Sequence, residues 1–159
     1  MTVVAGYTNG KEFAIAADSG AFDEAGQIKM TVAEAKVWFA GNSLQGGAGN
    51  FRALEVARRA NIENPQALSN YLMEANIAGE WSILVVNRRG VYELGEDGSV
   101  VRFKEPYGSI GAGGTLALGA LAAEHRAKIG TPAAIVRIAL DVCVRHSSAC
   151  STPVCVLSN

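Results

Sequence analysis

Residues 2–18 read TVVAGYTNGKEFAIAAD and contain two apolar runs separated by a turn. Asn9 and Gly10 tolerate positive φ, and Asn-Gly between apolar runs is the strongest short-range signal for a β-hairpin. The pattern predicts that the chain opens on a hairpin whose first strand starts at residue 2. Chain termini normally fray, but the hydrogen bonds of such a sheet would hold Thr2 in place.

The rest of the chain alternates between strand-like and helix-like stretches, with a turn expected at 23–26. Apolar residues repeat at helical spacing after Asn50, while Asn64-Pro65 and Thr131-Pro132 each have the cap and first-turn pattern of a helix start. Glycines at 108–114 indicate a loop that leads into a third helix. The predicted strands are 2–7, 13–17, 36–40, 43–46, 81–86, 90–94, 100–103 and 153–157, and the predicted helices start near residues 50, 64, 115 and 131.

This order of elements is neither strict strand–helix alternation nor all-β. Two helical layers that enclose a pair of sheets are the simplest arrangement that buries every apolar face. No repeat, linker or low-complexity segment interrupts the sequence. We therefore expect residues 1–159 to form one α+β domain.

The composition excludes several classes of protein. Of the 159 residues, 14 are Lys or Arg and 15 are Asp or Glu, so no basic surface is available for nucleic acid. No apolar run reaches the roughly 18 residues that a membrane span requires, and the N-terminus lacks the pattern of a signal peptide. We expect a cytoplasmic protein without nucleic-acid or membrane partners.

The odd number of cysteines favours free thiols in a reducing compartment. Together with His146, the cysteines Cys143, Cys150 and Cys155 have spacings that superficially suggest zinc. However, Cys143 and His146 lie in a predicted helix and Cys155 lies in the final strand, so separate elements would have to converge on one metal. Buried small apolar side chains are the preferred interpretation, and no metal or cofactor is expected.

Thr2-Val3-Val4-Ala5-Gly6, followed by Asp18 sixteen residues after Thr2, resembles the start of the proteasome β-subunit and of the peptidase subunit of the bacterial heat-shock-locus protease. Further similar runs occur in the same order at 35–38, 43–50 and 110–120, so the resemblance covers nearly the whole chain. It implies the N-terminal-nucleophile hydrolase fold, a four-layer α-β-β-α sandwich with two mainly antiparallel sheets. It also implies peptide-bond hydrolysis by Thr2, once Met1 has been removed.

The resemblance implies that Thr2, Asp18, Lys36 and Gly49 are catalytic. A threonine hydroxyl is a poor nucleophile unless a base takes its proton. The free α-amine of Thr2 has an ordinary pKa of about 7.7–8.0 and can act as that base through a water molecule. Lys36 would lower the pKa values of the amine and hydroxyl, Asp18 would orient Lys36, and the Gly49 N–H would stabilise the oxyanion.

Each of these residues also has a purely structural interpretation. Asp18 could be only a turn former. Lys36 could be a solvated charge, with Lys29 as a competing candidate for its role. Gly49 could serve close packing at a strand–helix junction, and Thr2 could merely permit removal of the initiator methionine.

Two accessory positions depart from the family pattern. Ala112, followed by Gly113, stands where the family usually has a serine between glycines. Ser147 stands where an aspartate is common, and the loop glycines that usually follow it are missing. In the family these groups support the threonine amine, so Ser147 or His146 would have to substitute. The alternative function is therefore a catalytically silent subunit with an assembly or scaffold role.

The resemblance implies a peptide or unfolded-protein substrate, a homo-oligomeric assembly and a possible ATPase partner. It does not imply a ring size or a substrate preference. A nucleotide-binding function is a weaker alternative, based on the glycine-rich run 111–114. That run lacks both the GxGxxG spacing and a Walker Lys-Ser/Thr.

Overall fold

The computed structural model describes residues 2–22, 28–31, 36–148 and 150–159. The helices are α1 (Phe51–Ala60), α2 (Pro65–Glu74), α3 (Gly114–Ala127) and α4 (Pro132–His146). The strands are β1 (Val4–Thr8), β2 (Phe13–Asp18), β3 (Gly20–Phe22), β4 (Ile28–Thr31), β5 (Val37–Ala40), β6 (Ser43–Gly49), β7 (Trp81–Asn87), β8 (Gly90–Gly95), β9 (Val100–Arg102), β10 (Tyr107–Ile110) and β11 (Val154–Ser158).

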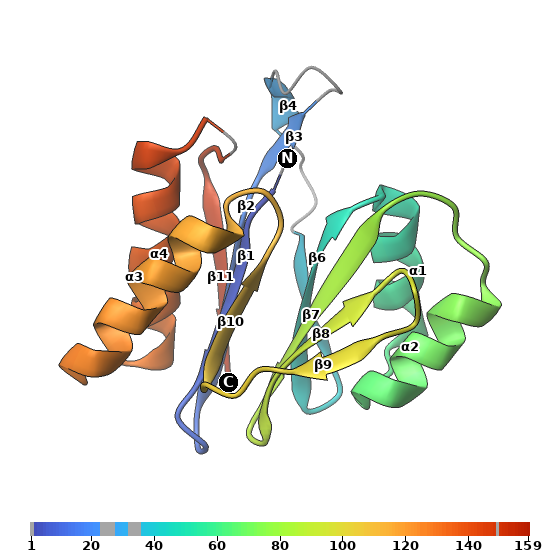
Figure 1. Cartoon of the computed structure of the whole chain (residues 1–159), viewed down its shortest axis with the longest axis horizontal. Coiled ribbons are helices and arrows are strands. Elements are labelled where there is room, and N and C mark those ends of the chain that lie inside the picture. The colour runs from blue at the N-terminus through green and yellow to red at the C-terminus, as the bar shows by residue number, and fades with distance from the viewer. Residues whose placement is uncertain (1, 23–27, 32–35, 149) are drawn as a thin grey trace.

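Two antiparallel sheets form the centre of the molecule. One has the strand order β10-β1-β2-β11 and the other has the order β5-β6-β7-β8-β9, while β3 and β4 form a separate hairpin. Helices α3 and α4 cover the outer face of the first sheet, and α1 and α2 cover the outer face of the second (Figure 1). This is the four-layer α-β-β-α sandwich expected from the sequence.

The alternation of side chains along β2 explains the layers. Phe13, Ile15 and Ala17 belong to the apolar cluster between the two sheets. Ala14 and Ala16 point to the opposite face and pack in the cluster beneath α3 and α4, as the period of two along a strand requires. A third cluster lies between the second sheet and α1 and α2. Each sheet is therefore buried on both faces.

The local signals for the first hairpin and for three helix starts are confirmed. The Asn9 side chain accepts hydrogen bonds from the N–H groups of Lys11 and Glu12 within the predicted turn. The two predicted capping residues do cap their helices, because each side chain accepts a hydrogen bond from a first-turn N–H: Asn64 from Ala67 and Thr131 from Ala134. Asn50, which was not predicted as a cap, accepts from the Arg52 N–H in the same way.

Two expectations about strands were wrong. The first strand begins at Val4 and not at residue 2, because the Val3 N–H is taken by the Asp18 carboxylate instead of a neighbouring strand. The glycine cluster at 108–114 is not entirely loop: its first residues belong to β10, which pairs antiparallel with β1. The β3–β4 hairpin was not expected either, and the turn predicted at 23–26 lies outside the described residues.

None of the helices in the described ranges combines the length and the apolar character that crossing a bilayer would require.

Candidate active site

Thr2 lies two residues before the start of β1 and is half-buried. Its carbonyl oxygen accepts a hydrogen bond from the Gly113 N–H at 3.4 Å. The next residue is held from both directions by Asp18: the Val3 N–H donates to Asp18 Oδ1 at 3.0 Å, and the Val3 carbonyl accepts from the Asp18 N–H at 3.3 Å. The backbone around Thr2 is therefore anchored to β2 and to the loop before α3.

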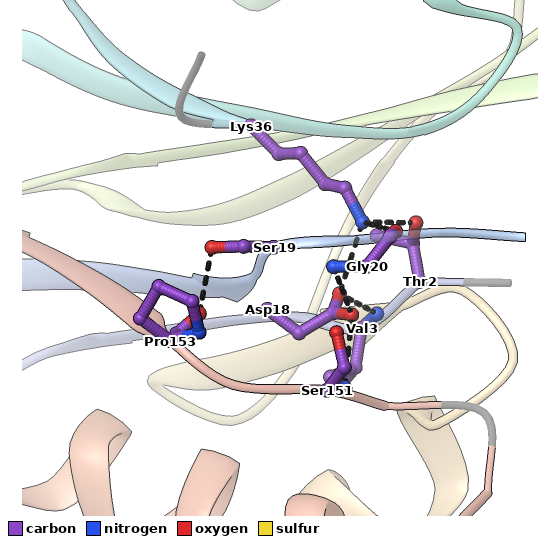
Figure 2. Close-up of polar contacts among 8 residues, drawn as sticks. All are labelled: Thr2, Val3, Asp18, Ser19, Gly20, Lys36, Ser151 and Pro153. Carbon is purple, nitrogen blue, oxygen red and sulfur yellow. Dashed lines mark hydrogen bonds and ion pairs between the residues drawn. The ribbon is translucent and has the colours of Figure 1, made fainter. Parts of the chain in front are cut away.

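Lys36 connects Thr2 to Asp18, as Figure 2 shows. Its ammonium nitrogen, Nζ, lies 2.8 Å from Thr2 Oγ1 and 3.2 Å from Asp18 Oδ1, and it also donates to the Gly20 carbonyl. An ammonium group has three protons and no acceptor, so these three partners satisfy it completely. Because Thr2 Oγ1 accepts from Lys36, the proton of the threonine hydroxyl remains for a different acceptor.

The Asp18 carboxylate accepts from four donors and is only 1% exposed. Oδ1 accepts from the Val3 N–H and Lys36, while Oδ2 accepts from the N–H groups of Gly20 at 3.1 Å and Ser151 at 3.3 Å. The contact with Gly20, two residues on, is a local turn contact. The turn interpretation of Asp18 was thus correct in part, but the same carboxylate also orients Lys36.

Burial determines the acid–base behaviour of Lys36, which is 2% exposed. Removal from water lowers the pKa of Lys36 below its ordinary value, and the charge and hydrogen bond of Asp18 raise it again in part. A buried ion pair of this kind depends on both members, because either charge alone would be left without compensation.

Gly49 ends β6 with a φ of 91°, and a Cβ there would lie 2.3 Å from the Glu80 carbonyl oxygen. Gly49 therefore does serve close packing at the junction of strand and helix, as its structural interpretation proposed. The Gly47 N–H donates to the Lys36 carbonyl at 3.0 Å. On the opposite side of β6, the Asn50 N–H donates to the Glu80 carbonyl. Because N–H groups alternate in direction along a strand, the Gly49 N–H lies on the same side of β6 as Lys36. Its role as an oxyanion donor stays a prediction.

The three accessory positions have different surroundings. Gly113 contacts Thr2 through its N–H. Ala112 is exposed in the turn between β10 and α3, and its methyl group cannot donate a hydrogen bond. Ser147 follows α4, where its N–H donates to the Cys143 carbonyl at 2.8 Å and its hydroxyl interacts with the Cys150 thiol.

Sequence reasoning missed the contribution of the segment before β11. The Ser151 N–H reaches Asp18, and the Ser19 hydroxyl donates to the Pro153 carbonyl at 2.6 Å. These are contacts of backbone groups more than 130 residues away in the sequence. Because every residue has these backbone groups, no residue type in the sequence indicates such a contact. Only the position of β11 beside β2 could have revealed it.

Two clefts lie away from the contact between Lys36 and Thr2. One, of about 760 Å³, is lined by residues that include Phe39 and Tyr92. The other, of about 590 Å³, lies between α3 and α4 and borders Gly113 and Ser147. Neither is lined by Thr2, Asp18 or Lys36.

The zinc interpretation of the cysteines has no support in the described ranges, where no group of three or more His, Cys, Asp or Glu side chains is arranged to hold a metal ion. Cys143 and Cys150 lie in the cluster beneath α3 and α4. Cys155 packs on the other face of the sheet, between the two sheets. Its separation from the other two follows from the alternation of side chains along β11.

Comparison with known proteins identifies the fold. No family model and no curated protein sequence matches the chain. Among solved structures, it is similar to BPH of Thiobacillus denitrificans in complex with epoxomicin, with 22% identity, a TM-score of 0.78 and coverage of 100% of this chain and 98% of that chain. It is also similar to eukaryotic HslV from Trypanosoma brucei, with 18% identity, a TM-score of 0.79 and coverage of 98% of both chains.

A second structure of the Thiobacillus denitrificans protein is similar over 100% of this chain and 97% of that chain, with 22% identity and a TM-score of 0.75. These similarities extend over the full length of the chain and confirm the resemblance that residues 2–18 indicated. The chain has the fold of the proteasome-type N-terminal-nucleophile hydrolases. Identities of this size establish the fold alone.

Proposed function

We propose that the chain is a proteasome-like threonine peptidase in which Thr2, made N-terminal by removal of Met1, hydrolyses amide bonds. The observation that carries this proposal is the 2.8 Å contact between Lys36 Nζ and Thr2 Oγ1, made by a lysine that the buried Asp18 holds in place. A hydroxyl just ahead of the first strand, beside a fixed positive charge, has the environment of an activated nucleophile.

The first step forms a bond between Thr2 Oγ1 and the carbonyl carbon of the substrate. The hydroxyl proton passes through a water molecule to the free α-amine of Thr2. The negative charge that develops on the substrate oxygen is stabilised by the Gly49 N–H. When the tetrahedral intermediate collapses, the amide C–N bond breaks and the amine of the leaving peptide takes the proton. An ester on Thr2 remains, and water hydrolyses it by the same route.

Lys36 contributes to this chemistry through its charge. A positive group within hydrogen-bond distance favours the deprotonated form of the hydroxyl and the neutral form of the α-amine. Asp18 keeps the ammonium aimed at Thr2 and also holds the Val3 N–H. A change at Asp18 would therefore affect both the charge and the position of the nucleophile.

The alternative function is a catalytically silent subunit with an assembly or scaffold role. Ala112 favours it, because this position has no hydroxyl that could support the α-amine. A retained Met1 would also favour it, since acylation of the Thr2 nitrogen removes the proposed base. The silent subunit and the peptidase can be told apart in one purified protein, because only the peptidase would hydrolyse a peptide substrate.

The direct test compares wild type, Thr2→Ala and Thr2→Ser on a fluorogenic peptide, with the intact mass recording whether Met1 is present. We expect Thr2→Ala to lose activity by at least about 10³-fold, because it lacks the nucleophilic oxygen, whereas Thr2→Ser keeps measurable turnover. Unchanged activity in Thr2→Ala would contradict the mechanism. An inactive wild type that lacks Met1 would favour the silent subunit.

The proposal includes a peptide or unfolded-protein substrate, a homo-oligomeric assembly, a possible ATPase partner and a cytoplasmic location. The exposed apolar side chains Phe39 (57% exposed), Phe51 (52%) and Val101 (54%) are candidate contact points for such an assembly. The three free thiols fit a reducing compartment.

A further inference from the structure

Two thiols lie beside the candidate active site, both against Gly113. Cys143 is in the last turn of α4 and Cys150 is in the segment that leads to β11. They are 0% and 6% exposed and share one apolar cluster. The largest influence on the acidity of each thiol is the other thiol. Both sulfurs lie against the same residue, Gly113, and a disulfide bond would bring them to roughly 2.05 Å.

Both thiols also contact Gly113, which holds Thr2. Cys143 Sγ lies 3.6 Å from the Gly113 carbonyl oxygen. Cys150 Sγ is so close that a Cβ on Gly113 would lie 2.7 Å from it. The N–H of the same glycine donates to the Thr2 carbonyl. A change at either sulfur would therefore act directly on Gly113, the residue that holds the backbone of Thr2.

A second connection leads from the thiols to Asp18. Cys150 directly precedes Ser151, whose N–H donates to Asp18 Oδ2 at 3.3 Å. The backbone of Cys150 is tied to α4, because its N–H donates to the Ser147 carbonyl at 3.3 Å. Movement of Cys150 toward Cys143 would shift this segment and, with it, one of the donors that orient the Asp18 carboxylate.

The two thiols differ in acidity. The hydrogen bond from Cys143 lowers the pKa of Cys150, with further lowering by Ser147 and Lys36, although burial and Asp18 oppose this. The same hydrogen bond, together with burial, raises the pKa of Cys143. Because the thiolate is the nucleophilic form of cysteine, we expect Cys150 to react first with an oxidant.

We propose that Cys143 and Cys150 form a reversible disulfide when a peroxide oxidises the protein, and that this disulfide lowers the activity of the Thr2 site by loosening Gly113. The thiolate of Cys150 attacks one peroxide oxygen, the O–O bond breaks, and a sulfenic acid and one water form. The Cys143 sulfur then attacks the Cys150 sulfur and expels the second water. Two electrons from the two thiols thus reduce hydrogen peroxide to two waters.

The loosening of Gly113 follows from the loss of a donor. In the reduced protein the single Cys143 proton is available to the Gly113 carbonyl or to the Cys150 sulfur. In the disulfide that proton is gone, so the Gly113 carbonyl loses its thiol donor and keeps only the Ala117 N–H, which donates at 3.1 Å. The loss of one of the two donors to a buried carbonyl weakens the hold on Gly113. The loop that carries Gly113 would adjust, and its N–H would hold the Thr2 carbonyl less firmly.

The test begins with the disulfide, which does not depend on any enzymatic activity. Wild type, Cys143→Ser, Cys150→Ser and Cys155→Ser are treated with hydrogen peroxide, and their intact masses and peptide maps are recorded. Cys155→Ser is the matched control, because Cys155 packs on the opposite face of the sheet. We expect wild type and Cys155→Ser to lose two hydrogen atoms and to give a Cys143–Cys150 cross-linked peptide that dithiothreitol reverses. A wild type that keeps both thiols free, or one that links Cys155, would overturn the proposal.

The effect on the site is measured by amide hydrogen exchange. We expect the peptide that contains Gly113 to exchange at least several-fold faster after oxidation of wild type and to recover after reduction. Unchanged exchange in the cross-linked protein would overturn the proposed effect on Thr2. The loss of peptidase activity on oxidation rests on the proposed function. If Thr2 proves inactive, the cross-link and the exchange rate still decide this inference.

Discussion

At the scale of single residues, the Lys36–Asp18 pair joins the nucleophile candidate to the sheet. Asp18→Asn removes the charge that compensates Lys36 and places an amide among backbone N–H donors. We expect it to lower the free energy of unfolding by about 3 kcal/mol, measured by urea denaturation. The control is Glu55→Gln, because the Glu55–Arg59 pair, although 2.6 Å apart, is largely exposed and should contribute no more than about 0.5 kcal/mol. Similar small losses in both variants would show that the buried pair is not needed for stability.

The pKa of Lys36 also determines a pH dependence. Burial lowers this pKa below the ordinary 10.5, so the positive charge beside Thr2 is lost as the pH rises through a value lower than 10.5. We expect kcat/KM to fall on the alkaline side before pH 10.5, while near-UV circular dichroism shows that the protein stays folded. Activity that is constant up to pH 10.5 would mean that the charge of Lys36 does not assist the reaction.

The residues that could be found from the sequence are those that act through characteristic side chains at characteristic spacing. Thr2, Asp18 and Lys36 are of this kind, and the structure brings them into contact; their catalytic roles stay predictions. Ser151 could not be found, because it acts through a backbone N–H that any residue has. The contact between Cys143 and Cys150 depends on how the chain leaves α4, which no local pattern encodes.

At the scale of elements, the junction of β6 and α1 requires glycine. Gly49→Ala would have to adopt a φ of 91° with its Cβ 2.3 Å from a backbone oxygen, so we expect a loss of at least about 2 kcal/mol in the free energy of unfolding. Gly119→Ala is the matched control, because it lies within α3 and its Cβ would meet nothing within 4 Å. We expect that variant to gain about 0.5–1 kcal/mol in the same urea titration. Equal effects of the two substitutions would contradict the proposed strain at Gly49.

Elements with local signals were predictable, and elements that depend on distant pairing were not. Two of the helices, α2 and α4, begin at the side-chain caps that the sequence indicated. The strand β10 was missed because Gly108 and Gly111 resemble a loop, and only its pairing with β1, from Val4 opposite Ile110 to Tyr7 opposite Tyr107, makes it a strand. The strands β3 and β4 were missed for a different reason: their pairing is local, but each is too short to show a strand pattern.

At the scale of the whole molecule, the order of the elements was sufficient to predict four layers. It did not specify which strands would be neighbours. In the first sheet, β10 and β11 flank the opening hairpin, so segments from near the end of the chain meet residues 2–18. This arrangement places the Gly113 loop and the segment before β11 against Thr2 and Asp18.

The proposed function predicts an assembly. We expect light scattering after size-exclusion chromatography to give a mass that is a multiple of the mass of one chain at micromolar concentration, because the resemblance to proteasome-type peptidases implies a homo-oligomer and Phe39 and Phe51 are available as contacts. A chain that is monomeric at all concentrations tested would contradict the homo-oligomer.

The most direct test of the central claim is the identification of the residue that an epoxyketone peptide modifies. Such a compound has two electrophilic groups, which a hydroxyl and an α-amine on the same residue can both attack. After incubation, peptide mapping by mass spectrometry locates the adduct. We expect it on Thr2 as the first residue of the chain, with Met1 absent, and we expect no adduct in Thr2→Ala. An adduct on any other residue, or an unmodified Thr2 in a protein that has lost Met1, would contradict the assignment of Thr2 as the nucleophile.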